Sequence, residues 1–147
     1  SLAFLPGCAA LDSFFSFLGF SDGSGDPNTP ESMVMAAMTD FNRGRDASAL
    51  KKFDEIKDRF PFTQHSLLAE LKSADCNYYE GNYVEAVAQY EEFASSHPTN
   101  EALPYVFFQI AMGHYKQIDT IARDPGAAMD AINAFTKLLK TYPDSPY

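Results

Sequence analysis

One spacing recurs three times along the 147-residue chain and constrains its fold more than any other feature. In each copy a small residue is followed by an aromatic residue at +4, an apolar residue at +7 and a proline at +12. The first three positions share one face of an α-helix, and a proline cannot continue a helix, so each copy predicts an amphipathic helix that ends at its proline. The copies are Ala49, Phe53, Ile56 and Pro61; Ala86, Tyr90, Phe93 and Pro98; and Ala131, Phe135, Leu138 and Pro143.

The pattern resembles the second helix of a tetratricopeptide repeat, in which a small residue lets two helices approach, an aromatic residue fills the gap and a proline closes the unit. Consecutive prolines in a regular array would be about 34 residues apart. Here Pro61 and Pro98 are 37 apart, and Pro98 and Pro143 are 45 apart. The units are therefore expected to be irregular.

Each unit needs a first helix, and residues 30–42, 64–80 and 102–119 are the candidates. Thr29-Pro30 and Asp124-Pro125 are typical helix starts, and Asp46 and Asn82 can cap the helices that follow them. We predict an all-α tetratricopeptide-type solenoid of about three irregular helix pairs, cut at its C-terminal end. The expected repeats are residues 30–63, 64–100 and 101–147. A plain helical bundle without repeats is the alternative.

The composition excludes several function classes. Of the 147 residues, 46% are hydrophobic, which is enough for a substantial core, and the formal charge of −9 disfavours nucleic acid because phosphates would be repelled. There is no Gly-rich phosphate loop, no Cys-x-x-Cys pair and no run of about 18 apolar residues. His65, His97 and His114 lie in different units, so neither a metal nor another cofactor is expected, and no set of residues predicts an enzyme.

The N-terminal segment differs from the rest. Leu5-Pro6-Gly7-Cys8 is similar to the lipobox of a bacterial lipoprotein, in which the cysteine thiol takes the lipid, and the missing initiator Met suggests a signal peptide trimmed upstream. Residues 1–29 are then a lipobox, an acylated Cys8 and a flexible tether. Ala9 and Ala10 follow the cysteine where an Asp would favour the inner membrane, so we expect anchoring at the periplasmic face of the outer membrane. An accidental cysteine in an apolar tail is the alternative.

Two further N-terminal features stay open. The Phe-rich stretch from Phe14 to Phe20 is too short to span a bilayer and could lie in a lipid interface or pack on protein. Cys76 is predicted to be a small buried side chain, with a Cys8 to Cys76 disulfide as the alternative, which acylation of Cys8 would forbid.

First helices of such repeats line a groove, and its residues can be predicted by taking Ala37, Ala74 and Gly113 as the small contact positions. The resulting surface is apolar and aromatic, which suits an extended peptide with large alternate side chains. The alternative is that several of these residues are core between helices. The predicted peptide-groove residues are Val34, Met38, Phe41, Leu71, Asp75, Tyr78, Tyr79, Phe107, Ile110 and His114.

A lipobox cysteine leading into irregular repeats resembles the BamD family of outer-membrane assembly lipoproteins, also called YfiO or ComL. The stretches "RFPF" (59–62) and "RDP" (123–125) add to the likeness, which covers residues 8–147, about the first half of such a protein. The resemblance implies a periplasmic scaffold that serves a β-barrel insertase. Implied partners are the insertase's periplasmic domains, accessory assembly lipoproteins and unfolded outer-membrane proteins. A soluble periplasmic tetratricopeptide adaptor for cell division or envelope maintenance is the alternative, and Cys8 discriminates the two.

Overall fold

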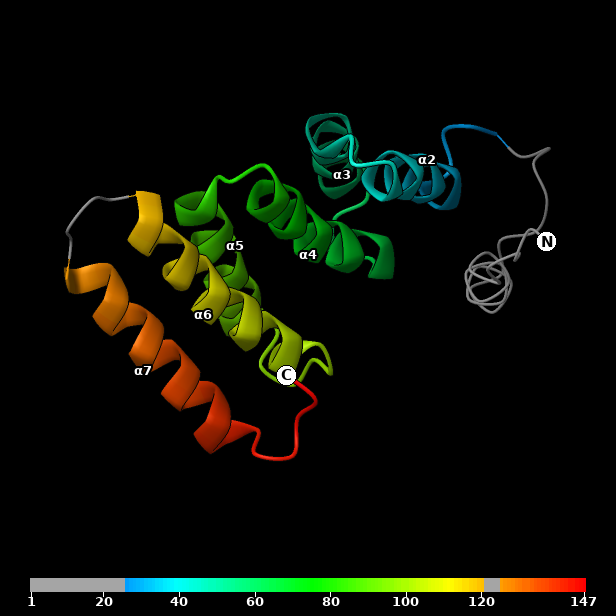
Figure 1. Ribbon diagram of the computed structural model, residues 1–147. Helices are drawn as coiled ribbons and strands as arrows, with labels where there is room; N and C mark the ends of the chain where they lie inside the picture. The colour runs from blue at the N-terminus through cyan, green and yellow to red at the C-terminus, as the bar shows by residue number, and fades with distance from the viewer. Residues whose placement is uncertain (1–25, 121–124) are drawn as a thin grey trace, which may run out of the picture.

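A computed structural model describes residues 26–120 and 125–147. These residues form α-helices joined by short turns, and the described ranges contain no β-strand. Along the chain the helices advance from α2 and α3 at one end of the array to α6 and α7 at the other (Figure 1). The helices are α2 (Pro30–Asn42), α3 (Asp46–Arg59), α4 (Gln64–Tyr79), α5 (Tyr83–Ser96), α6 (Leu103–Thr120) and α7 (Pro125–Thr141).

Each helix packs mainly against the helix before it and the helix after it in the chain. Helix α2 also contacts α4, so the first helices of the first two pairs touch directly. This arrangement of pairs α2/α3, α4/α5 and α6/α7 confirms the predicted all-α helical array. The predicted first helices also agree with α2, α4 and α6 to within one residue at each end.

The recurring positions of the sequence form the core. Ala49, Phe53 and Ile56 are completely buried in a first cluster with residues of α2 and α4. In the second copy Ala86 and Tyr90 are equally buried, within a cluster that α4, α5 and α6 share. The spacing therefore marks the residues that bind α3 and α5 to both of their neighbours, whereas in the third copy Ala131 and Leu138 are buried and Phe135 is half-buried.

The helix starts follow the predicted capping only in part. Thr29 and Thr63 cap α2 and α4, since each side chain accepts a hydrogen bond from the backbone N–H three residues on. Asp46 is the first helical residue of α3 and not its cap. Asn82 occupies the cap position of α5 without a side-chain capping bond, because its amide is turned toward Asn77 Oδ1 at 3.5 Å.

Helices α5 and α6 approach closely at Gly113. A methyl group at this position would clash with Cγ2 of Val87 on α5. Gly113 thus fills the role predicted for it, that of a small residue at a helix contact.

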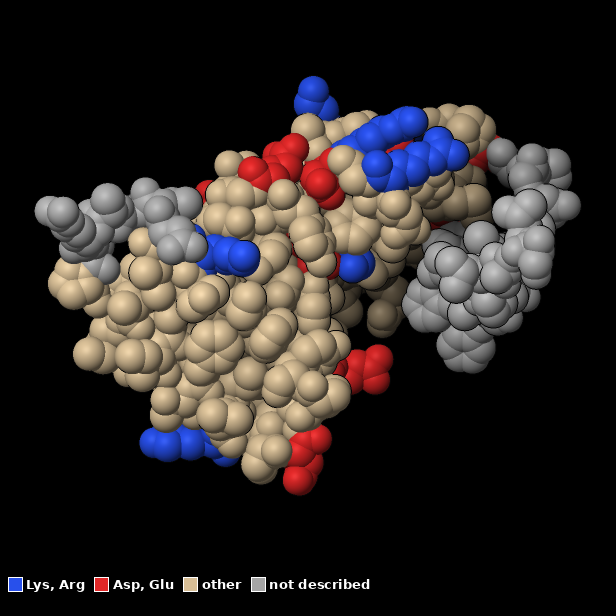
Figure 2. All heavy atoms as spheres, in the orientation of Figure 1, with Lys and Arg blue, Asp and Glu red and all other residues tan. Residues whose placement is uncertain are grey.

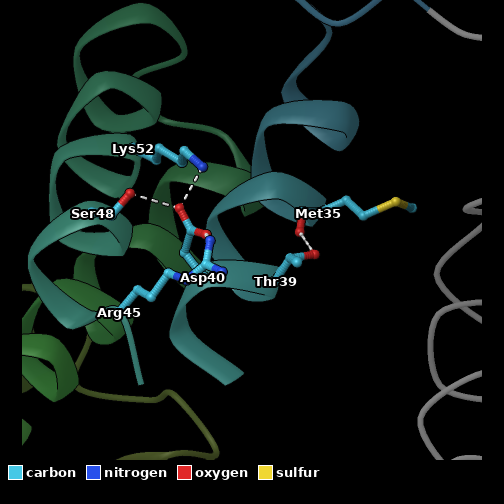
Figure 3. Close-up of polar contacts among 6 residues, drawn as sticks. All are labelled: Met35, Thr39, Asp40, Arg45, Ser48 and Lys52. Atoms are coloured by element: carbon cyan, nitrogen blue, oxygen red, sulfur yellow. Dashed lines mark hydrogen bonds and ion pairs between the residues drawn. The ribbon is translucent and has the colours of Figure 1, made fainter. Parts of the chain in front are cut away.

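A buried carboxylate joins α2 to α3 (Figure 3). Asp40 accepts hydrogen bonds from Lys52 Nζ at 2.5 Å and Ser48 Oγ at 2.6 Å, and Arg45 Nη1 lies 3.5 Å away. The hydrogen bond from Lys52 is the main cause that lowers the pKa of Asp40 from its ordinary value of 3.8, and the bond from Ser48 acts in the same direction. Asp40 is therefore charged at neutral pH and holds the first helix pair together.

Charged side chains are unevenly distributed over the face in Figure 2. Lys and Arg gather over the α2 and α3 end, with acidic side chains beside them, whereas most of the area over α6 and α7 carries no charge. The predictions for Cys8 and for the Phe14 to Phe20 stretch concern residues outside the described ranges.

Candidate peptide-binding surface

The structure distributes the ten predicted groove residues among the core and two separate surfaces. Val34 and Asp75 are buried, so neither side chain is exposed to a bound peptide. Met38 and Tyr78 are half-buried and pack on the first and second core clusters, respectively. The interpretation of such residues as core, which the sequence left open, applies to these positions.

Aromatic side chains of α2 and α4 meet on one surface. Phe41 and Tyr79 pack edge to face with their ring centroids 5.8 Å apart, and Tyr79 is 60% exposed. The ammonium group of Lys72 lies 4.7 Å from the centroid of Phe41, within the range of a cation–π contact. The first two repeats thus present exposed aromatic area beside a single positive charge.

The same lysine borders a hollow that continues the surface into the third repeat. The hollow has a volume of about 540 Å³ and is lined by Leu71, Lys72, Tyr105 and Tyr147 among others. Tyr147 packs against Tyr105 at 5.6 Å between ring centroids. Together these residues form one continuous surface, made of Phe41, Leu71, Lys72, Tyr79, Tyr105 and Tyr147. We call it the first-helix surface, because every member except Tyr147 comes from α2, α4 or α6.

Asp75 lies beneath the first-helix surface and holds two of its residues in place. Its Oδ1 accepts hydrogen bonds from Tyr90 OH at 2.6 Å and Tyr105 OH at 2.8 Å, and its Oδ2 accepts one from Lys72 Nζ at 2.7 Å. Gln109 Nε2 donates to both phenol oxygens, at 3.3 Å and 3.1 Å. A buried carboxylate with this many donors is fully satisfied, so its role is to position side chains and not to bind a ligand.

Burial raises the pKa values of the Tyr90 and Tyr105 hydroxyls, and the negative charge of Asp75 raises them further. Both phenols therefore remain protonated donors at neutral pH. Burial likewise raises the pKa of the Cys76 thiol to about 12, with the charge of Asp46 the next cause. Cys76 is a free, buried thiol, as predicted, and is unreactive at neutral pH because the thiolate is the nucleophile.

A second hollow, separate from the first-helix surface, is lined by the three predicted groove residues of α6. Phe107, Ile110 and His114 line it together with residues of the second helices α5 and α7, around a volume of about 690 Å³. Lys137 of α7 lies over Phe107 at 4.7 Å from the ring centroid. These residues therefore share a surface with second helices, not with Phe41 and Tyr79.

The described residues contain neither a group of three His, Cys, Asp or Glu side chains that could hold a metal ion nor a helix long and apolar enough to cross a membrane. Comparison with known families gives a direct match, to the model described as "YfiO: Outer membrane lipoprotein", over residues 27–147. The chain belongs to the YfiO family. The match covers all six helices and confirms the resemblance that the sequence motifs indicated.

The relatives of this chain include outer membrane protein assembly factors of several bacteria. The chain is 29% identical over 132 residues to the outer membrane protein assembly factor BamD of Vibrio cholerae, covering 82% of this chain and 55% of that protein. It is 27% identical over 107 residues to the same factor of Caulobacter vibrioides, covering 73% of this chain and 35% of that protein. The aligned regions thus span about a third to a half of these relatives.

Three residues of the first-helix surface, Lys72, Tyr105 and Tyr147, were not predicted from the sequence. Lys72 was detectable in principle, as a cation next to the predicted groove residue Leu71. Tyr105 and Tyr147 come together only because the segment after α7 returns to the start of α6, which no periodicity reveals (Figure 1).

Proposed function

We propose that this chain is part of a lipid-anchored periplasmic scaffold of the outer-membrane β-barrel assembly machinery. YfiO-family membership and the names of the relatives support an assembly role. The observation that carries the proposal is the first-helix surface, where the exposed rings of Tyr79 and Tyr147 and the half-buried rings of Phe41 and Tyr105 lie on one side of three successive helix pairs, with Lys72 among them.

The first-helix surface has the chemistry to bind an extended, unfolded polypeptide. Exposed rings such as Tyr79 offer large contact area at low conformational cost, and Tyr105 OH is held in place by Asp75. The Lys72 ammonium donates one hydrogen bond to Asp75 and keeps two further N–H donors for a carboxylate or backbone carbonyl of the peptide. Unfolded outer-membrane proteins, whose strands carry alternate aromatic side chains, are the proposed ligands, and we expect no catalysis.

Further partners follow from the family. We propose accessory assembly lipoproteins and the periplasmic domains of the β-barrel insertase as the proteins that the scaffold brings together. Their contacts with this chain would involve surfaces other than the first-helix surface, so that a substrate and a partner can be held at the same time.

The test of the peptide site is a binding measurement on this chain with a fluorescent peptide that copies the aromatic C-terminal strand of a β-barrel protein. Tyr79→Ala should weaken binding at least ~10-fold, because a few aromatic anchors usually dominate such affinity. Tyr115→Ala is the matched control, since Tyr115 is also half-exposed but lies outside the first-helix surface. Unchanged affinity in the Tyr79 variant, or an equal loss in the control, would refute the site.

The proposed anchor is tested at Cys8. Labelling of cells with a fatty-acid analogue should modify the wild-type protein and leave Cys8→Ala unlabelled and soluble in the periplasm, because each buried methylene contributes about 0.8 kcal/mol to membrane binding. An unlabelled wild-type protein would favour the soluble periplasmic adaptor over the lipid-anchored scaffold.

A further inference from the structure

Phe62, in the turn between α3 and α4, combines full exposure with an unfavourable backbone conformation. Its relative exposure is 103%, the highest among the large apolar residues exposed on the described part of the chain. Its φ is +64°, and it is the one described residue other than glycine with a positive φ. A bulky side chain rarely adopts this region, and such an outlier directs attention to function.

The turn is held firmly on both sides of Phe62. Thr63 Oγ1 donates to the carbonyl of Phe60 at 2.7 Å and accepts from the N–H of Ser66 at 3.1 Å. Phe60 packs against the first core cluster. Phe62 is therefore presented to solvent by a fixed loop, while its neighbours Phe60 and Thr63 serve the fold.

A hollow of about 430 Å³ is lined by Phe62 and by residues of α3, α4 and α5. Its ionisable side chains are Lys57, Glu70, Glu92 and His97. Lys57 is paired with Asp54 at 2.8 Å, and His97 contacts Glu70 at 2.7 Å. Glu92 is exposed and has no ion-pair partner among the residues that the structure describes, so the hollow offers an aromatic face and a free carboxylate together.

We propose that Phe62 and this hollow form a docking site for an arginine side chain of a partner protein, in which the guanidinium stacks on the Phe62 ring and pairs with Glu92. A planar guanidinium can do both at once, since it binds aromatic faces and donates two parallel hydrogen bonds to a carboxylate. The volume suits one or two side chains, and an acidic chain of net charge −9 attracts a basic partner. This site is independent of the first-helix surface and stands if the peptide site fails.

The test is a titration of the ¹⁵N-labelled chain with the peptide acetyl-Leu-Arg-Leu-amide, followed by NMR. Amide shifts should centre on Phe62, Thr63 and Glu92. The same peptide with citrulline in place of arginine keeps the shape and loses the charge, and it should bind roughly 10-fold more weakly because hydrogen bonds to charged groups are the stronger ones.

Two variants and two controls complete the experiment. Phe62→Gly should abolish the shifts and leave the fold intact, since glycine accepts a positive φ without strain. Glu92→Gln should weaken binding of the arginine peptide roughly 10-fold. The controls Glu85→Gln and Tyr115→Ala should leave this binding unchanged, since Glu85 is exposed on the same helix as Glu92 and both control residues lie outside the hollow. Equal binding of the citrulline peptide, shifts that map elsewhere, an unaffected Glu92→Gln variant or no binding at all would each overturn the proposal.

Discussion

Two buried carboxylates show how single residues shape this acidic protein. Asp40 joins α2 to α3, and Asp75 joins α4, α5 and α6. Each is surrounded by donors, which offsets the cost of removing a charge from water. Removing one donor should therefore lower the free energy of unfolding by more than its hydrogen bond contributes, because the carboxylate stays buried.

Tyr90→Phe removes one donor to Asp75 without changing the shape of the ring. We expect a loss of about 1–3 kcal/mol in the free energy of unfolding, since a buried acceptor loses part of its hydrogen bonding. Urea unfolding at pH 7 measures this loss. Tyr115→Phe removes an exposed hydroxyl and should change stability by less than about 0.5 kcal/mol; a similar loss in both variants would contradict the role assigned to Asp75.

The lowered pKa of Asp40 predicts a pH dependence of stability. Its charged form is stabilised in the folded state by Lys52 and Ser48, so its contribution is fully present above its unfolded pKa, near 3.8, and is lost as the pH falls through the lower folded value. Asp40→Asn should therefore be clearly destabilised at pH 7.

The deficit of Asp40→Asn should shrink below pH 4, where the wild-type carboxyl also becomes neutral. Urea unfolding at a series of pH values between 7 and 3 checks the trend. Asp54→Asn is the control, because Asp54 is half-exposed and forms a solvated ion pair that contributes little at any pH. A deficit of Asp40→Asn that stays constant over this range would contradict the assignment.

At the scale of elements, the contacts between neighbouring helices depend on small residues. Ala37, Ala74 and Gly113 occupy equivalent positions in the three first helices, and all three are buried. Of these, Gly113 is under the tightest constraint, because Val87 leaves no room for a Cβ atom.

Gly113→Ala should destabilise the protein by about 1–3 kcal/mol through overpacking, although alanine favours a helix by about 1 kcal/mol over glycine. Combining it with Val87→Ala should restore part of the loss, because the shortened side chain vacates the space that the new methyl needs. A double-mutant cycle measured by urea unfolding gives the coupling. Additive effects would show that the two helices do not meet as closely as described.

At the scale of the whole molecule, the last helix leaves an apolar stripe uncovered. Ile132 and Leu139 of α7 are 59% and 64% exposed, and Met129 continues the same stripe. Phe135 and Tyr142 beside them are half-buried. An apolar helix face of this kind favours association.

We expect this chain to self-associate at high concentration, and Ile132→Gln with Leu139→Gln to reduce the association without lowering stability. Sedimentation at several protein concentrations measures it. Val84→Gln is the control, since Val84 is equally exposed but lies on α5. A wild-type chain that stays monomeric at every concentration would contradict the prediction, as would an equal effect of the control.

Local pattern by itself predicted the helices, their succession in pairs and most of the core residues of the second helices. The spacing of Ala86, Tyr90 and Phe93 predicts which face of a helix is buried, because periodicity along one helix depends only on that helix. Family membership was also accessible, from short stretches such as "RFPF".

Only the tertiary structure decided which first-helix residues share a surface. Phe107 and His114 turned out to face second helices, and Asp75 turned out to be buried under Tyr90 and Tyr105. The register of a first helix predicts its buried face, but irregular repeats rotate successive helices by amounts set by side-chain packing between them. The packing of the whole array therefore decides which residues of different helix pairs meet. The spacing of residues within one pair does not reveal this packing.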